Sequence, residues 1–226
     1  MSKILLALSF AGGIAVAAAG WLLWPREPEQ RTAAALMDAV MWNKEPVGGP
    51  FALVDQDGQK RTSDEFRGKL LLIYFGFTFC SDICPIDLQS IAGALDNLGP
   101  AGEAVQPLFI TVDPEKDTPA QLKGYVGLFH PRMIGLTGSA KDIRSVALAY
   151  KVYYAKTAPT SLADRGIDHT GFTFLLGRDG EYLGFFPPGT SADRMTETIR
   201  PHLAMRERNP TNQDRRSTKP EQQTQR

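Results

Sequence analysis

The sequence predicts an α/β sandwich with a mixed central sheet and flanking helices. Two observations carry this prediction. Between residues 69 and 152, β-prone runs alternate with helix-like segments, and the chain then closes with a hairpin pattern and a last helix. The chain has 226 residues, which is enough for one good-sized domain with appendages and too few for two comfortable domains.

The composition is that of an ordinary globular protein, with 42% hydrophobic and 22% charged residues. Because 25 basic side chains face 25 acidic ones, the chain has no basic excess of the kind that binds nucleic acid. Its two cysteines are too few for a scaffold built on disulfides. The core must therefore come from the burial of apolar side chains.

Residues 1–24 are predicted to form a membrane anchor. Residues 4–24 are uncharged and match the ~20 residues that cross a hydrocarbon core as a helix. A cleaved signal peptide is the alternative, since Ala17–Ala19 offers a small-residue cleavage site, but the apolar run continues beyond it to Trp24. Lys3 before the span places the N-terminus inside. We expect a single-pass protein of a bacterial inner membrane whose C-terminal domain lies in the periplasm.

Three segments follow the anchor. Residues 25–47 are mixed in composition and flanked by prolines, which indicates a linker. Residues 48–206 carry the alternating pattern and form the folded domain. Residues 207–226 are rich in Pro, Gln, Arg and Thr without an apolar pattern, and we expect a disordered tail.

The first half of the folded domain is predicted to be a hairpin, a strand, a helix and a second strand. The run "FALVDQDGQKRT" (51–62) contains an Asp-Gly turn, which is a hairpin signal. "KLLLIYFGF" (69–77) is continuously β-prone and suits a strand buried on both faces. "PIDLQSIAGALDNLG" (85–99) has apolar residues at roughly helical spacing and ends in glycine before a proline. "PLFITVD" (107–113) is the next strand.

The second half repeats the alternation and then closes the sheet. "TPAQLKGYVGLFH" (118–130) begins with a threonine cap and a proline at the first helical position. "MIGLTG" (133–138) is a short strand and "SAKDIRSVALAYKV" (139–152) a helix. "HTGFTFLLGRDGEYLGFF" (169–186) has two β-rich runs about an Asp-Gly turn, again a hairpin. "SADRMTETIRPHLAMR" (191–206) is a last helix that its proline bends or ends.

The chain's two cysteines, Cys80 and Cys84, lie between the first central strand and its helix. Sites in open α/β sheets form beyond the carboxyl ends of strands, so this position favours function. Because Pro85 follows directly, we expect Cys84 to cap the helix and the helix N-terminus to lower the thiol pKa. The pair is a disulfide staple, a redox couple or part of a metal site. A staple across so small a loop would constrain the unfolded chain little.

His169 is the strongest candidate for a third group beside the cysteines. His202 falls in the last predicted helix, where a surface or half-buried position is the simplest interpretation. His130 ends a helix before a proline, where a histidine caps carbonyls. His169 follows a polar loop and precedes a strand predicted to be central, so its loop can meet the loop of the cysteines. An exposed loop histidine is the equally weighted alternative.

Two thiolates and one imidazole suit copper. Soft sulfur selects Cu(I), and imidazole suits copper in either oxidation state. Structural zinc normally takes four protein ligands, and no fourth cysteine or histidine is placed convincingly. A carboxylate such as Asp168 is the remaining way to complete a zinc set, and the same carboxylate is a candidate for orienting His169.

Four runs of the sequence resemble, in order, the signatures of the Sco/SenC family: "GFTFCSDICP", "FITVDPEKDTP", "LTGSAKDIRSVALAYKVYY" and "DHTGFTFLLGRDGEYLGFF". The resemblance covers about residues 48–205. It implies a membrane-anchored protein with a thioredoxin-like fold and a copper ion, Cu(I) or Cu(II), held by Cys80, Cys84 and His169. It also implies delivery of copper to the CuA centre in subunit II of cytochrome c oxidase, or maintenance of that centre's thiols.

The chain departs from the family at Phe77 and Phe79, where many members have tyrosine or histidine. These positions are not ligands, so we expect tuning of the pocket and no loss of binding. The "VDPEKDTP" run (112–119) is either a functional loop or an ordinary loop that connects a strand to a helix, and we prefer the second interpretation.

The leading hypothesis is a periplasmic copper chaperone that hands its ion to the oxidase subunit, with other copper carriers or thiol reductants as further partners. The alternative is a thiol-disulfide oxidoreductase in which Cys80 attacks and Cys84 resolves. That activity needs no histidine, and it usually employs a two-residue spacer where this chain has three residues, "SDI". A thioredoxin-like peroxidase would want a threonine and an arginine around its cysteine, for which Thr78 alone is weak support.

Overall fold

The computed structural model of the chain describes residues 46–80, 83–157 and 166–204. The expected anchor, most of the expected linker and the expected tail lie outside these residues. Within the three ranges, no helix is both long and apolar enough to span a bilayer.

The described residues contain a mixed sheet of seven strands in the order β2-β1-β5-β4-β3-β8-β9. Its three central strands are parallel, and the pairs outside them are antiparallel. This confirms the predicted mixed sheet. The strands are β1 (Ala52–Asp55), β2 (Lys60–Thr62), β3 (Leu70–Gly76), β4 (Val105–Thr111), β5 (Ile134–Thr137), β8 (Thr173–Leu176) and β9 (Tyr182–Phe186).

Both predicted hairpins are present, since β1 pairs with β2 and β8 with β9. The helices that connect and follow the strands are α3 (Ile83–Leu98), α4 (Pro119–Val126), α5 (Ala140–Ala149) and α6 (Ala192–Ala204), with short 3-10 helices η1 (Ser63–Phe66) and η2 (Gly99–Ala104). The predicted start of α4 is confirmed, because the Thr118 hydroxyl accepts the N–H of Gln121 and proline follows it. Pro201 lies inside α6 and does not end it.

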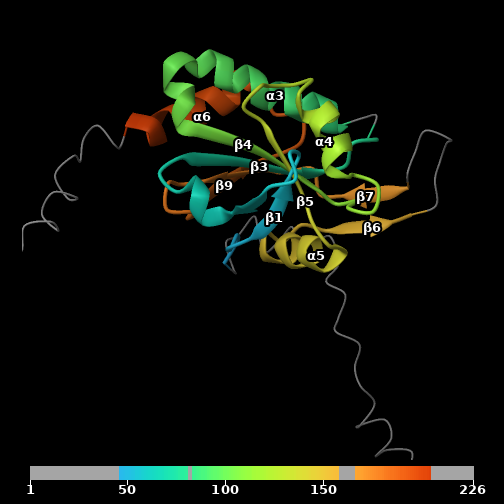
Figure 1. Cartoon of the computed structure of the whole chain (residues 1–226). Coiled ribbons are helices and arrows are strands. Elements are labelled where there is room, and N and C mark those ends of the chain that lie inside the picture. The colour runs from blue at the N-terminus through green and yellow to red at the C-terminus, as the bar shows by residue number, and fades with distance from the viewer. Residues whose placement is uncertain (1–45, 81–82, 158–165, 205–226) are drawn as a thin grey trace, which may run out of the picture. The chain divides into compact units, whose positions relative to one another are not determined.

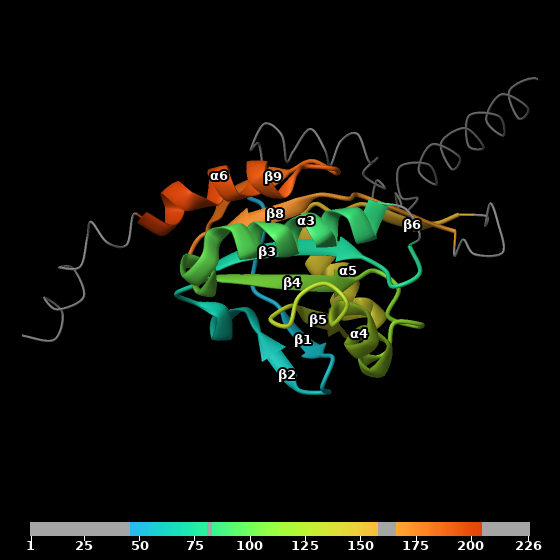
Figure 2. The same cartoon turned by 90° about the horizontal axis from the view of Figure 1, so that it is seen from above.

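Helices cover both faces of the sheet, with α3 and α6 on one side and α5 on the other (Figure 1). The alternating side chains of β3 divide between two cores, as its period of two requires. The odd-numbered residues 71–75 join the core that includes α5, and the even-numbered residues 70–74 join the core of α3, α4 and α6. Every residue of β3 is buried. The strand lies between β4 and β8 in the sheet (Figure 2), so the loop that follows it starts from the packed interior of the domain.

A second, two-stranded sheet was not predicted. It consists of β6 (Tyr154–Lys156) and β7 (Ile167–His169), which pair antiparallel, and we call it the β6–β7 ribbon. The predicted closing hairpin began at His169, whereas in the structure that residue ends β7 and the buried strand β8 begins only at Thr173. The three-residue strands of the ribbon are too short to give a periodic signal in the sequence.

Candidate metal centre

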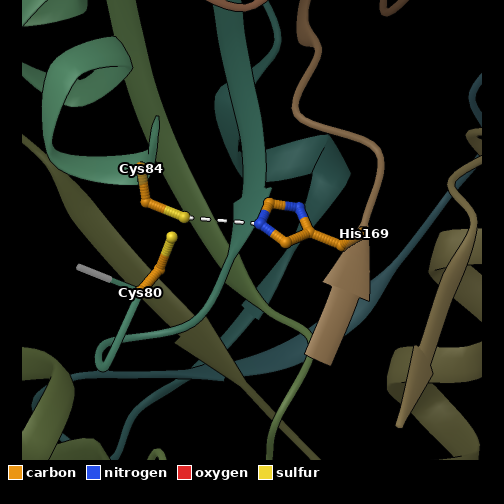
Figure 3. A group of neighbouring side chains, drawn as sticks. All are labelled: Cys80, Cys84 and His169. Atoms are coloured by element: carbon orange, nitrogen blue, oxygen red, sulfur yellow. Dashed lines mark hydrogen bonds between the residues drawn. The ribbon is translucent and has the colours of Figure 1, made fainter. Parts of the chain in front are cut away.

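The structure brings Cys80, Cys84 and His169 together at the carboxyl end of β3. Cys80 lies on the loop after β3, Cys84 in the first turn of α3 and His169 at the end of β7. Figure 3 shows the Cys84 sulfur facing the imidazole and the Cys80 sulfur beside that of Cys84. The three potential ligand atoms all lie within 4.8 Å of one another. Of the two alternatives left open for His169, the structure shows the one in which its imidazole meets the two thiols.

The spacing of these atoms fits one shared metal ion. Metal–sulfur and metal–nitrogen bonds of roughly 2.3 and 2.0 Å, at tetrahedral or trigonal angles, place two ligand atoms about 3.5–4 Å apart. The Sγ atom of Cys84 lies 3.4 Å from Nε2 of His169. The structure has both cysteines as thiols, with Cys84 buried and Cys80 half-buried. The cluster is therefore already arranged for an ion that bonds all three donors.

The expected position of Cys84 was wrong by a residue or two. Helix α3 begins at Ile83, so Cys84 lies inside the first turn and does not cap the helix. Proline is tolerated in this turn because the first N–H groups of a helix have no intrahelical acceptor, and its missing donor removes no bond. The register turns the Cys84 side chain towards the sheet, where it is buried in the core of α3, α4 and α6.

The expected effect on thiol acidity was also wrong for this residue. The pKa of the Cys84 thiol is raised, first because the Cys80 thiol lies against it and then because burial disfavours the thiolate. A metal ion that binds Cys84 must displace this proton, because cysteine ligates as thiolate.

His169 is oriented by the backbone and by two aromatic rings. Its Nδ1 atom lies 3.3 Å from the carbonyl oxygen of Thr170, so an Nδ1–H donor leaves Nε2 facing Cys84. The rings of Phe77 and Tyr74 contact the imidazole edge-on, at centroid distances of 5.7 and 6.3 Å. Asp168 is exposed. The carbonyl of Thr170, and not the carboxylate of Asp168, therefore orients the imidazole.

The other histidines lie elsewhere. His130 follows α4, and its Nδ1 atom accepts the N–H of Arg132, so the ring does not cap helix carbonyls through that nitrogen. His202 is half-buried in α6, as expected. Within the described ranges, the cluster that can hold a metal has three members and includes neither Asp168 nor a fourth cysteine or histidine. This composition does not meet the four-ligand norm of structural zinc.

Gly76 ends β3 directly beneath the sulfur atom of Cys84. A Cβ atom at this position would lie 3.0 Å from the Cys84 Sγ atom and 2.9 Å from a ring carbon of Tyr74. The absence of a side chain lets the buried cysteine approach the sheet. In the sequence Gly76 only interrupts an apolar run, so the local pattern does not predict its contact with Cys84.

Asp87 is a buried carboxylate one helical turn after Cys84. It is 1% exposed, and its Oδ1 atom accepts the N–H of Gly189 at 2.7 Å. Its Oδ2 atom is buried and has no hydrogen-bond partner among the described residues. Burial raises the pKa of Asp87 above its usual 3.8, and the bond from Gly189 only partly offsets this. The position follows the helical spacing of the buried residues Leu88 and Ile91, but the pattern does not predict an acid there.

We predict that Asp87→Asn makes the protein more stable than wild type as pH rises. Because the folded pKa of Asp87 is raised, the native state holds its proton more tightly than the unfolded state, and ionisation costs stability between pH 3.8 and the folded pKa. The asparagine keeps an oxygen for Gly189 and has no charge. Urea unfolding from pH 4 to pH 8 measures the difference in the free energy of unfolding, which should grow with pH and then level off. A constant or shrinking difference would contradict the prediction.

Comparisons with known proteins find a matching family model and related chains. The SCO1/SenC family model matches residues 40–204. The bovine mitochondrial SCO2 homolog is 41% identical over 191 residues, covering 81% of this chain and 70% of the relative.

Two solved structures with copper bound share the fold. Arabidopsis thaliana ScoI is 40% identical, with a TM-score of 0.66 over 70% of this chain and 99% of its own. Bradyrhizobium japonicum ScoI is 36% identical, with a TM-score of 0.64 over 69% of this chain and 99% of its own. The fold is the thioredoxin-like α/β sandwich that the resemblance implied. With a family match over most of its length, this chain belongs to the SCO1/SenC family.

Proposed function

We propose that this protein is a copper chaperone that delivers copper to the CuA site in subunit II of cytochrome c oxidase, or keeps the thiols of that site reduced. The observation that supports it most is the convergence of Cys80, Cys84 and His169 within 4.8 Å. Two soft sulfur donors and an imidazole match the preferences of copper, and three donors fall short of a structural zinc set.

The unequal burial of the two cysteines suits transfer by ligand exchange. Cys84 and the imidazole hold the ion from the protein side, whereas Cys80 is half-buried on the loop and meets solvent. An incoming thiolate of the recipient replaces Cys80 first, and the remaining two bonds follow. With three donors the ion keeps room for such an incoming ligand.

A second candidate is thiol-disulfide exchange, which the same burial pattern favours. The half-buried Cys80 attacks a partner disulfide as thiolate, forms a mixed disulfide and releases one partner thiolate. Cys84 then loses its proton to solvent and attacks Cys80, which releases the second partner thiolate. The partner is reduced and the Cys80–Cys84 pair oxidised, and His169 has no part in the sequence.

The proposed setting is the periplasmic face of a bacterial inner membrane. Residues 1–24 would anchor the chain, residues 25–47 link the anchor to the domain of residues 48–206, and residues 207–226 form a tail. The uncharged stretch near the N-terminus supports this arrangement.

The test is a copper titration of the full-length, reduced chain in detergent against a chromophoric Cu(I) chelator. One ion retained per chain, followed by its transfer to the isolated CuA domain of subunit II, is the expected result. Cu(II) bound through thiolate should add intense charge-transfer absorption. A chain that loses all copper to the chelator and reduces a partner disulfide would be an oxidoreductase and not a chaperone.

A further inference from the structure

The sequence predicts residues 112–119 to be an ordinary loop between a strand and a helix. In the structure, Asp117 of this loop also contacts the loop that carries Cys80 through Thr78. Asp117 is 0% exposed on the loop between β4 and α4. Its carboxylate accepts the backbone N–H of Thr78 at 3.0 Å and the Thr78 hydroxyl at 2.7 Å. It also accepts the hydroxyl of Thr111, the last residue of β4, at 2.6 Å.

These bonds join two loops that leave the sheet at its carboxyl end. Thr78 lies on the loop after β3, two residues before Cys80, and is itself buried. The N–H of Cys80 donates to the carbonyl of Phe77 at 3.2 Å, which closes a turn around Thr78. Gln121 of α4 donates to the Thr78 hydroxyl at 3.4 Å. Thr78 therefore attaches the turn that carries Cys80 to the loop and helix that follow β4.

We propose that Asp117 is a positioning residue for the metal site, which holds the sulfur of Cys80 at bonding distance from the ion shared with Cys84 and His169. The inference rests on the proposed function and deepens it. Cys84 is fixed by α3 and His169 by the β6–β7 ribbon, whereas Cys80 stands on a loop. A buried carboxylate that takes both donors of Thr78 ties this loop to the loop between β4 and α4 and so supports the position of Cys80.

The test compares Asp117→Ala with Asp117→Asn in the full-length reduced chain. Alanine removes all three acceptor contacts, and Cu(I) affinity in chelator competition should fall by about tenfold, the lower end of the range for groups that support ligands. The asparagine oxygen can take the place of Oδ2 and accept both the Thr78 N–H and the Thr111 hydroxyl, and its amide then donates to the Thr78 hydroxyl. It should restore an affinity close to that of wild type.

Asp55 offers a matched control. It is equally buried, accepts the N–H groups of Asp57 and Gln59 and the guanidinium of Arg61, and lies on β1, which β5 and β4 separate from β3. Asp55→Ala should lower the urea midpoint, as Asp117→Ala does, but leave the copper affinity unchanged. The proposal is overturned if Asp117→Ala binds copper as wild type does, or if Asp55→Ala loses affinity to the same extent.

Thr78→Val covers the case in which Asp117→Ala does not fold. Valine keeps the backbone N–H bond and the side-chain shape but removes the hydroxyl, so the fold should persist and the affinity fall less than in Asp117→Ala. If Thr78→Val binds copper as tightly as wild type, the bonds between Thr78 and Asp117 do not position Cys80.

A readout without copper separates this inference from the proposed function. If Cys80 is less well held in Asp117→Ala, disulfide formation with Cys84 should be about tenfold less favourable, which raises the reduction potential of the pair by about 30 mV. Failure of wild type to retain copper would reject the chaperone function. The potential shift in Asp117→Ala, absent in Asp55→Ala, would still support the positioning role, and an unchanged potential would overturn it.

Discussion

Replacing His169 with alanine is expected to lower the Cu(I) affinity by more than about 100-fold, beyond the 10–100-fold that loss of a ligand's supporting partner costs. The imidazole is the one nitrogen donor of the cluster, and its Nε2 atom lies 3.4 Å from the Cys84 sulfur. Two thiols remain, so exchange with a partner disulfide should proceed at nearly the wild-type rate. Competition with a chromophoric chelator measures the first quantity, and a mixed-disulfide assay measures the second.

His202→Ala is the matched control for this experiment, because that histidine is half-buried in α6 and outside the cluster. It should leave both quantities unchanged. If His169→Ala holds copper as tightly as wild type, the three-donor site is refuted. Replacing either cysteine with serine is expected to abolish copper binding and exchange together, so those variants do not separate the chaperone from the oxidoreductase.

Replacing Gly76 with alanine is expected to damage stability and copper binding together. The new methyl group would meet the Tyr74 ring at 2.9 Å, the Cys84 sulfur at 3.0 Å and the Phe109 ring at 3.1 Å. Overpacking of this kind in a buried strand costs about 1–3 kcal/mol of unfolding free energy. Because the sulfur of Cys84 is one of the atoms that must yield, the metal site moves with the core. Urea unfolding and chelator competition measure the two effects.

Gly124→Ala makes a control with the opposite expected sign. Gly124 lies within α4, and a Cβ atom there meets nothing within 4 Å. Alanine in an open helical position stabilises by about 0.5–1 kcal/mol relative to glycine. If Gly76→Ala keeps the stability and the copper affinity of wild type, the core beneath Cys84 can accommodate the methyl group, and the prediction for Gly76 is wrong.

The main sheet and its helices could be predicted because their signals are local. The apolar run of β3, the Asp-Gly turns of the two hairpins and the Thr118 cap each lie within a few neighbouring residues. The β6–β7 ribbon could not be predicted, because three-residue strands carry no period and their stability depends on pairing across the fold.

The candidate site divides in the same way. Its two cysteines and their place at the end of a strand follow from local sequence. His169 was a candidate from its place before a strand, with an exposed loop position as the alternative, and the family resemblance implied it as the third ligand. The residues that support the site could not be predicted from local sequence. Asp117 contacts Thr78, and Gly76 lies against Cys84, only because the packed structure brings these residues together. The raised pKa of the Cys84 thiol has the same origin, because its causes are the neighbouring Cys80 thiol and burial in the packed core.

The wide separation of Cys84 and His169 along the chain, 85 residues, has a consequence for the lifetime of the protein. An ion bonded to both would tie the first turn of α3 to the end of β7 and so close a long loop. Unfolding would then require either release of the ion or a strongly restricted unfolded chain, and the gain in stability grows with the excess of free copper over its dissociation constant. Loaded and empty molecules would therefore differ in resistance to proteolysis, and degradation would select against chains that carry no cargo.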